Sequence, residues 1–252
     1  MLTAGIDIGS TAVKAALWNG ESFQFFLHPT GWSPKESAQE AFDALLSASG
    51  VSAADVSRVV ATGYGRKMCS FAQKNVTEIT CHAAGAAKML SGISVLLDIG
   101  GQDSKVIVME PDGAVRDFLM NDKCAAGTGR FLQNMAVLLE YTLDDFAQIP
   151  ENSAVQPVSS MCTVFAETEV ISLIAKGVPK ESIAMGLLDS VASRAAGMIT
   201  RLSQEGSVGF TGGAAKNRLL ANMIAKHLGR EVLVPEYPQF AGAAGAALIA
   251  AR

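Results

Sequence analysis

Residues 5–11 read Gly-Ile-Asp-Ile-Gly-Ser-Thr, and residues 97–103 read Leu-Asp-Ile-Gly-Gly-Gln-Asp. In each stretch an apolar run ends in Asp-Ile-Gly, and a Lys follows the Asp by seven residues, as Lys14 and Lys105. Both stretches continue through a second β-rich run and a polar turn into a third run, so residues 5–27 and 97–119 have one common design of strand, Gly turn, strand, turn and strand. This internal duplication predicts two similar subdomains.

Helical patterns and short strands fill the rest of the chain. Ser33-Pro34-Lys35-Glu36 combines an N-cap Ser, Pro at the first helical position and Glu three residues after the Ser, and Gly50 closes the pattern. Apolar residues at helical spacing between Ile183 and Leu202 predict a long amphipathic helix. Short β-like runs at 93–97, 208–211 and 232–234 lie between helical patterns, which indicates an α/β fold.

Composition excludes several classes of protein. The 252 residues suffice for one to two domains, and 49% apolar with 17% charged residues excludes a mainly disordered chain. The net charge is −4 and basic residues form no cluster, so we expect no nucleic-acid partner. The longest apolar stretch, 240–251, is too short for the ~20 residues of a membrane span. Without a basic leader before an apolar segment, a cytoplasmic protein with no membrane partner is expected.

The glycine turns have the chemistry of phosphate sites. A tight turn rich in Gly and Ser or Thr exposes consecutive backbone N–H groups, which bind anions, and an Asp at the end of the strand can hold Mg²⁺ through water. Either turn alone would be interpreted as an ordinary hairpin, but two matched copies favour nucleotide binding. A third pair, Gly212-Gly213, ends another short strand and precedes Asn217. No Gly-x-x-x-x-Gly-Lys-Ser/Thr motif occurs, which excludes a P-loop enzyme.

The three glycine sites, in this order, resemble those of the actin, Hsp70 and sugar-kinase superfamily of ATPases. The small-residue stretch 240–246 is similar to the C-terminal helix of that superfamily. The resemblance implies an α/β fold with two duplicated RNase H-like, or actin-like ATPase, domains around a nucleotide cleft. Domain I would comprise residues 1–92 plus 235–252, with the first phosphate turn, and domain II residues 93–234, with the second turn, the adenosine site and the cysteines discussed below.

The same resemblance assigns roles by position. It implies that Asp7, Gln102 and Asp103 are catalytic, and that Asp7 also holds Mg²⁺ through water. The residues implied to bind ATP or ADP are Gly9, Ser10, Thr11, Lys14, Gly100, Gly101, Gln102, Gly212, Gly213 and Asn217.

Two of the four cysteines have a context that indicates chemistry. Cys124 and Cys162 each precede a helical pattern, so both are predicted at helix N-termini, where partial positive charge favours a thiolate. A [4Fe–4S] cluster usually takes four Cys thiolates, and a twofold dimer of this chain would supply them. Two unrelated reduced thiols remain the alternative. We assign no such role to Cys69 and Cys81, and His82 is interpreted as a hydrogen-bonded structural residue.

Four longer motifs make the resemblance specific. They are Ala61-Thr-Gly-Tyr-Gly-Arg66, Asp98-Ile-Gly-Gly-Gln-Asp-Ser-Lys105, Met120-Asn-Asp-Lys-Cys-Ala-Ala-Gly-Thr-Gly-Arg130 and Cys162-Thr-Val-Phe-Ala-Glu167. Together they resemble the activators of 2-hydroxyacyl-CoA dehydratases, a family that includes the ATPase subunits of benzoyl-CoA reductase and the reductases of double-cubane-cluster proteins.

The family resemblance implies a homodimer with one [4Fe–4S] cluster, bound by Cys124 and Cys162 of both subunits. It implies ATP-dependent electron transfer from reduced ferredoxin or flavodoxin to a partner iron–sulfur enzyme. The motifs leave open whether that partner is a dehydratase or a double-cubane protein.

Two other classes share the superfamily fold. One is a small-molecule kinase for a sugar or an acid, with Asp103 as catalytic base; against it, the chain is short and has no obvious insertion for a substrate pocket. The other is an actin-like scaffold or filament protein. Iron content and nucleotide-dependent sedimentation would separate these classes.

Overall fold

The chain forms two compact units in a computed structural model that describes residues 1–159 and 163–252. Unit 1 comprises Met1–Leu96, Ile107–Asp117 and Pro235–Arg252, and unit 2 comprises Leu97–Val106 and Phe118–Val234. The division falls within strands of the second sheet described below. The predicted domain boundaries before residues 93 and 235 stay a prediction.

The first sheet belongs to unit 1 and has the strand order β3-β2-β1-β4-β5. Strand β1 pairs antiparallel with β2 and parallel with β4, and Asp7 lies opposite Lys14 in the first of these pairs. The strands of this sheet and the first two α-helices are β1 (Thr3–Ile8), β2 (Ala12–Trp18), β3 (Phe23–Pro29), α1 (Pro34–Ser49), β4 (Arg58–Thr62), β5 (Lys74–Asn75) and α2 (Glu78–Met89).

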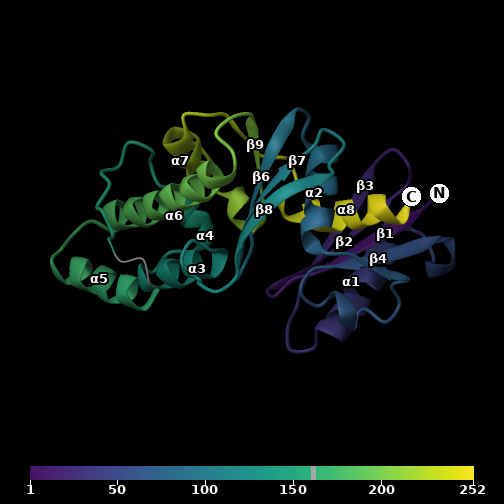
Figure 1. Ribbon diagram of the computed structural model, residues 1–252. Helices are drawn as coiled ribbons and strands as arrows, with labels where there is room; N and C mark the ends of the chain where they lie inside the picture. The colour runs from purple at the N-terminus through teal and green to yellow at the C-terminus, as the bar shows by residue number, and fades with distance from the viewer. Residues whose placement is uncertain (160–162) are drawn as a thin grey trace. The chain divides into compact units, whose positions relative to one another are not determined.

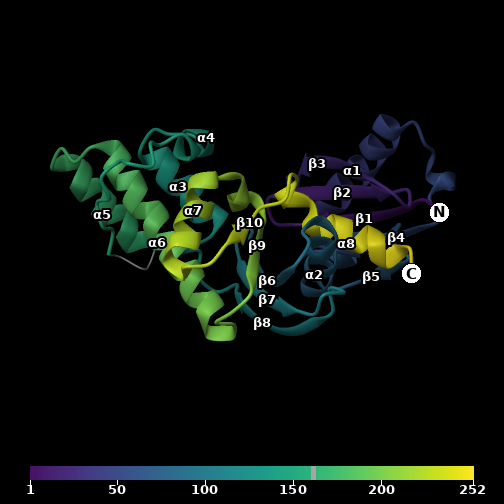
Figure 2. The same ribbon diagram turned by 90° about the horizontal axis from the view of Figure 1, so that it is seen from above.

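Helices cover both faces of this sheet because its strands are apolar on both sides. Alternate residues such as Ile6, Ile8 and Val13 pack with Phe42 and Leu45 of α1. On the other face, small residues of the C-terminal helix α8 (Ala241–Ala250) lie against the sheet and against α2, as Figure 2 shows. The backbones of α2 and α8 touch, since a Cβ added at Gly85 would overlap the carbonyl oxygen of Ala241.

The second sheet repeats the first, with the strand order β8-β7-β6-β9-β10. The predicted duplication of strands is therefore confirmed. Helices α6 and α7 lie side by side in both views (Figure 1). The remaining elements are β6 (Ile93–Ile99), β7 (Ser104–Met109), β8 (Val115–Asn121), α3 (Gly129–Leu138), α4 (Leu143–Ala147), α5 (Thr163–Ala175), α6 (Lys180–Leu202), β9 (Ser207–Thr211), α7 (Arg218–Leu228) and β10 (Val232–Leu233).

The predicted helix boundaries follow their capping residues. The Ser33 hydroxyl accepts a hydrogen bond from the Glu36 amide at the start of α1, and Gly50 ends that helix with a φ of 67° in the left-handed region. Helix α6 (Lys180–Leu202) contains the residues whose apolar spacing predicted a long helix. In the described part of the chain, every helix is too short or too polar to cross a bilayer.

Candidate functional site

The first glycine turn presents its hydroxyl residues to solvent above a buried carboxylate. Ser10 and Thr11 are exposed, whereas Asp7 is 3% exposed. The Lys14 Nζ lies 3.4 Å from Asp7 Oδ2 and partly compensates its charge. The amide of Gly9 donates to the Ala12 carbonyl oxygen at 3.1 Å, which closes the turn. The turn thus combines a carboxylate, an ammonium group and exposed hydroxyl groups, as a site for Mg²⁺ and phosphate requires.

The second turn also pairs a lysine with carboxylates, but it has two carboxylates and no exposed hydroxyl group. The Nζ of Lys105 lies 2.8 Å from Asp103 Oδ2 and 3.6 Å from Asp98 Oδ2. Asp98 and Lys105 are buried, Asp103 is half-buried, and Gln102 is exposed. The Gly100 amide donates to the Asp103 carbonyl oxygen at 2.9 Å. Asp103 and Gln102 are therefore the side chains of this turn that solvent or a nucleotide can reach.

The third glycine pair is joined to the second turn. Gly212 has a φ of 90°, and its Cα faces the Ile99 backbone so closely that any Cβ would overlap it. The Thr211 hydroxyl donates to Asp98 Oδ1 at 2.8 Å. Asn217 caps α7, where its Oδ1 accepts from the Leu220 amide at 2.9 Å. Thr211 was missed in the sequence analysis, because its side chain is part of an otherwise ordinary strand.

Cys124 lies in a loop that is fixed at both ends. The Asn121 side-chain amide donates to the Cys124 carbonyl oxygen at 3.0 Å. At the other end, the amides of Gly129 and Arg130 donate to the carbonyl oxygens of Gly100 and Gly101, both at 2.9 Å. The start of α3 is thus hydrogen-bonded directly to the second glycine turn.

The prediction that Cys124 is at a helix N-terminus is wrong. Helix α3 begins at Gly129, five residues after Cys124, with Thr128 as its N-cap. The chain turns at Gly127, which has a φ of 84°, before the helix can begin. Since the helix dipole acts within the first turn, it offers Cys124 little stabilisation of a thiolate. The other predicted ligand, Cys162, lies outside the described residues, and α5 begins at Thr163.

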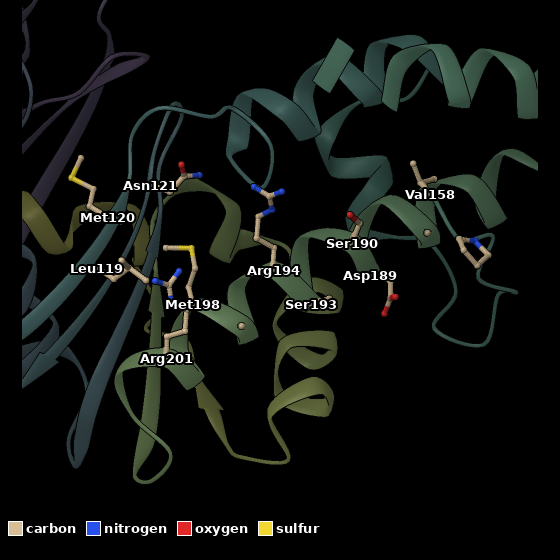
Figure 3. Close-up of a pocket in the computed structure, with 13 residues that line it drawn as sticks. Leu119, Met120, Asn121, Val158, Asp189, Ser190, Ser193, Arg194, Met198 and Arg201 are labelled. Atoms are coloured by element: carbon tan, nitrogen blue, oxygen red, sulfur yellow. The ribbon is translucent and has the colours of Figure 1, made fainter. Parts of the chain in front are cut away.

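A cavity of about 710 Å³ lies between the end of β8 and successive turns of α6 (Figure 3). Asn121 and Arg194 are among its lining residues. The Arg194 Nη1 donates to the Ala126 carbonyl oxygen at 3.4 Å, and a Cβ on Gly127 would come within 2.8 Å of Arg194 Cδ. Two cavity residues thus contact the backbone of the Cys124 loop. Arg194 was missed because its position within the α6 pattern carries no distinguishing signal.

The other two cysteines are buried in unit 1. Burial raises the pKa of Cys69 to about 11 and the pKa of Cys81 to about 12, so both thiols stay protonated at neutral pH. Cys124, in contrast, is only half-buried and lies on a loop in unit 2. Within 1–159 and 163–252, no group of three or more His, Cys, Asp or Glu side chains could hold a metal ion alone.

Residues 4–250 match the BadF/BadG/BcrA/BcrD ATPase family. The chain belongs to this family. It is 44% identical over 252 residues to the activator of lactoyl-CoA dehydratase of Anaerotignum propionicum, and the match covers 99% of this chain and 97% of that relative. It is 33% identical to one of the subunits of benzoyl-CoA reductase of Thauera aromatica, with 98% and 92% covered. The predicted family resemblance is confirmed.

Solved structures of the BadF/BadG/BcrA/BcrD ATPase family have the same fold. The activator of 2-hydroxyisocaproyl-CoA dehydratase from Clostridium difficile, with bound ADPNP, superposes with a TM-score of 0.92 at 40% identity, covering 99% of this chain and 94% of that one. A ROK family glucokinase from Streptomyces griseus, at 16% identity with a TM-score of 0.57 over 100% and 99% of the chains, shows the shared fold alone. The chain is an ATPase with an actin-like fold, as predicted. Membership favours an activator over the kinase and scaffold alternatives.

Proposed function

We propose that this ATPase transfers electrons to a partner enzyme through a [4Fe–4S] cluster that two copies of the chain share. Cys124 and Cys162 of each copy would hold the cluster, which would act as a one-electron carrier of low reduction potential. The observation that carries the proposal is the pair of hydrogen bonds from Gly129 and Arg130 to Gly100 and Gly101. Through them, a displacement of the phosphate turn reaches the Cys124 loop without crossing a flexible linker.

The two duplicated turns would bind the phosphates of ATP or ADP. The backbone N–H of Gly101, with Ser10, Thr11 and Lys14, would contact phosphate oxygens, and Asp7 would hold Mg²⁺ through water. Gly9 and Gly100, whose N–H groups close the turns, would let the phosphates approach the backbone. Gln102 and Asp103, which solvent reaches in the second turn, would orient the attacking water. Gly212, Gly213 and Asn217 would lie next to the adenosine. We assign the first turn to a domain of residues 1–92 plus 235–252 and the second to residues 93–234.

The names of the relatives indicate which partner proteins this chain would have. These relatives activate 2-hydroxyacyl-CoA dehydratases or form part of benzoyl-CoA reductase. We propose an iron–sulfur dehydratase, reductase or double-cubane component as acceptor, and ferredoxin or flavodoxin as donor. The cycle would take place in the cytoplasm, where such carriers are reduced.

Iron content tests the proposed cluster. Cys124→Ser and Cys162→Ser should each abolish iron binding after anaerobic purification, while Cys69→Ser and Cys81→Ser should retain one cluster per dimer. Exchange of ADP for ADPNP should then change the electron paramagnetic resonance spectrum of the reduced wild-type protein. Full iron content in Cys124→Ser would refute the ligand assignment. Identical spectra, with binding of both nucleotides verified, would refute the coupling.

A further inference from the structure

His82 lies beside the buried carboxylate of Asp7, although the two residues belong to different elements of unit 1. His82 is 6% exposed and lies in the first turns of α2, and Asp7 is 3% exposed in β1. A Cβ built on Gly242 of α8 would come within 2.8 Å of His82 Nε2 and 3.0 Å of Asp7 Oδ2. Both atoms therefore border the same small space above the Gly242 Cα.

The contact between α2 and α8 fixes this arrangement. A Cβ at Gly85 would overlap the carbonyl oxygen of Ala241, and one at Gly245 would overlap the carbonyl oxygen of Cys81. The residues on either side of His82 thus lie directly against the backbone of α8. The backbone of α2 on both sides of His82 is thus held at a fixed, short distance from α8.

A lysine and a second glycine also lie close to the Asp7 carboxylate. Lys14 Nζ lies 3.4 Å from Oδ2, and a Cβ on Gly63 would overlap Oδ1. Side chains are thus excluded at Gly63 and Gly242, whereas an imidazole is retained at position 82. If His82 served only for packing, an apolar side chain could fill the same space without the free-energy cost of burying a polar group.

We propose that His82 is a positioning residue of the nucleotide site, which holds the Asp7 carboxylate in the orientation that ATP hydrolysis requires. The inference rests on the proposed role of Asp7. A side chain that orients a ligating carboxylate is worth about 10- to 100-fold in activity. His82→Ala should therefore lower kcat for ATP hydrolysis at least ~10-fold while KM for ATP stays within about threefold. His82→Gln, which keeps a polar end of similar reach, should restore kcat to within about threefold of wild type.

Matched controls separate positioning from general damage. His227→Gln makes a comparable change at an exposed histidine that pairs with Asp189, and it should leave kcat unchanged. Gly242→Ala places a methyl group within 3.0 Å of both His82 Nε2 and Asp7 Oδ2 and should lower kcat as much as His82→Ala does. Gly197→Ala, on α6, has nothing within 4 Å of the new methyl group and should be neutral. A normal kcat in folded His82→Ala, or equal losses in His82→Ala and His82→Gln, would overturn the proposal.

A measurement on the wild-type protein decides the matter if His82→Ala does not fold. The chain has three histidines, so their imidazole ¹⁵N resonances can be assigned with His→Gln variants at positions 28 and 227. Saturating MgADP should shift the Nε2 resonance of His82 and leave that of His227 in place. An unmoved His82 resonance, with ADP binding verified by equilibrium dialysis, would refute the inference. Wild-type ATPase activity in Asp7→Asn would instead refute the proposed site itself.

Discussion

The hydroxyl group of Ser104 donates a buried hydrogen bond of 2.9 Å to the carbonyl oxygen of Gly127. Ser104 begins β7 directly after the second phosphate turn, and Gly127 is the glycine at which the Cys124 loop turns toward α3. This bond is a side-chain link between the turn and the loop, next to the backbone bonds from Gly129 and Arg130. The end of the loop next to α3 is therefore tied to the second glycine turn.

Ser104→Ala should lower the free energy of unfolding by about 1–2 kcal/mol, because the Gly127 carbonyl oxygen loses its buried partner. It should also reduce the nucleotide-dependent change in the cluster spectrum while iron content stays normal. Urea unfolding and electron paramagnetic resonance give the two measurements. Ser203→Ala removes an exposed bond to the Glu205 carbonyl oxygen and serves as the matched control. An unchanged spectral response in Ser104→Ala would show that this bond does not transmit the nucleotide state.

The two duplicated lysines should differ in their effect on stability. Lys105→Met leaves Asp98 and Asp103 without their shared ammonium group at a site where Lys105 is 3% exposed, and should cost about 3 kcal/mol. Lys14 is 19% exposed and lies farther from its single carboxylate, so Lys14→Met should cost about 1 kcal/mol. Urea unfolding of both variants measures the difference. Equal costs would mean that the lower burial of Lys14 does not reduce its contribution.

Substitution of the carboxylates should separate hydrolysis from cluster binding. Asp7→Asn or Asp103→Asn should lower the rate of ATP hydrolysis by at least ~10²-fold, or roughly 2.7 kcal/mol in barrier height. Iron content should not change, because the two carboxylates pair with Lys14 and Lys105 rather than with the Cys124 loop. Anaerobic steady-state kinetics and iron assays test both statements. Normal hydrolysis in both variants would remove these residues from the catalytic assignment.

Cysteine alkylation should depend on pH as burial dictates. In iron-free protein at pH 8, the thiolate fraction is about 10⁻³ for Cys69 and about 10⁻⁴ for Cys81, given pKa values near 11 and 12. Iodoacetamide should therefore modify Cys124 before Cys69 and Cys81, and the reactivity of the buried pair should rise about tenfold per pH unit as long as the fold persists. Peptide mass spectrometry measures each site. Rapid alkylation of Cys81 at pH 8 would contradict its burial.

Arg194 should restrain the Cys124 loop. Arg194→Gln removes the contact with the Ala126 carbonyl oxygen and should ease opening of the loop by about 1 kcal/mol, which raises the alkylation rate of Cys124 about fivefold. Arg201→Gln makes the same change in charge at another residue that lines the cavity, and it should have no effect. The rates are compared in iron-free protein at one pH. Equal rates in the two variants would assign the effect to charge alone.

Much of the fold could be predicted because its signals are local. Caps at Ser33 and Gly50, the α6 spacing and the repeated Asp-Ile-Gly turns identified the helices and the duplication. What could not be predicted depends on contacts distant in sequence. Thr211 reaches Asp98, Arg194 reaches Ala126, and His82 lies near Asp7 through Gly242, and no spacing within one segment encodes these pairs. The error at Cys124 arose because a glycine-rich loop does not fix where the following helix begins.

The backbone contact between α2 and α8 has a consequence for synthesis of the chain. These helices belong to one unit, yet roughly 150 residues separate them, which at about 10 residues per second means that α8 leaves the ribosome about 15 s after α2. Until then, Gly85 and the face of the first sheet that packs against α8 lack that helix as a packing partner. During this interval the nascent N-terminal segment leaves apolar surface accessible to chaperones. The unit that contains the first glycine turn is therefore completed last, although its first strand is synthesised first.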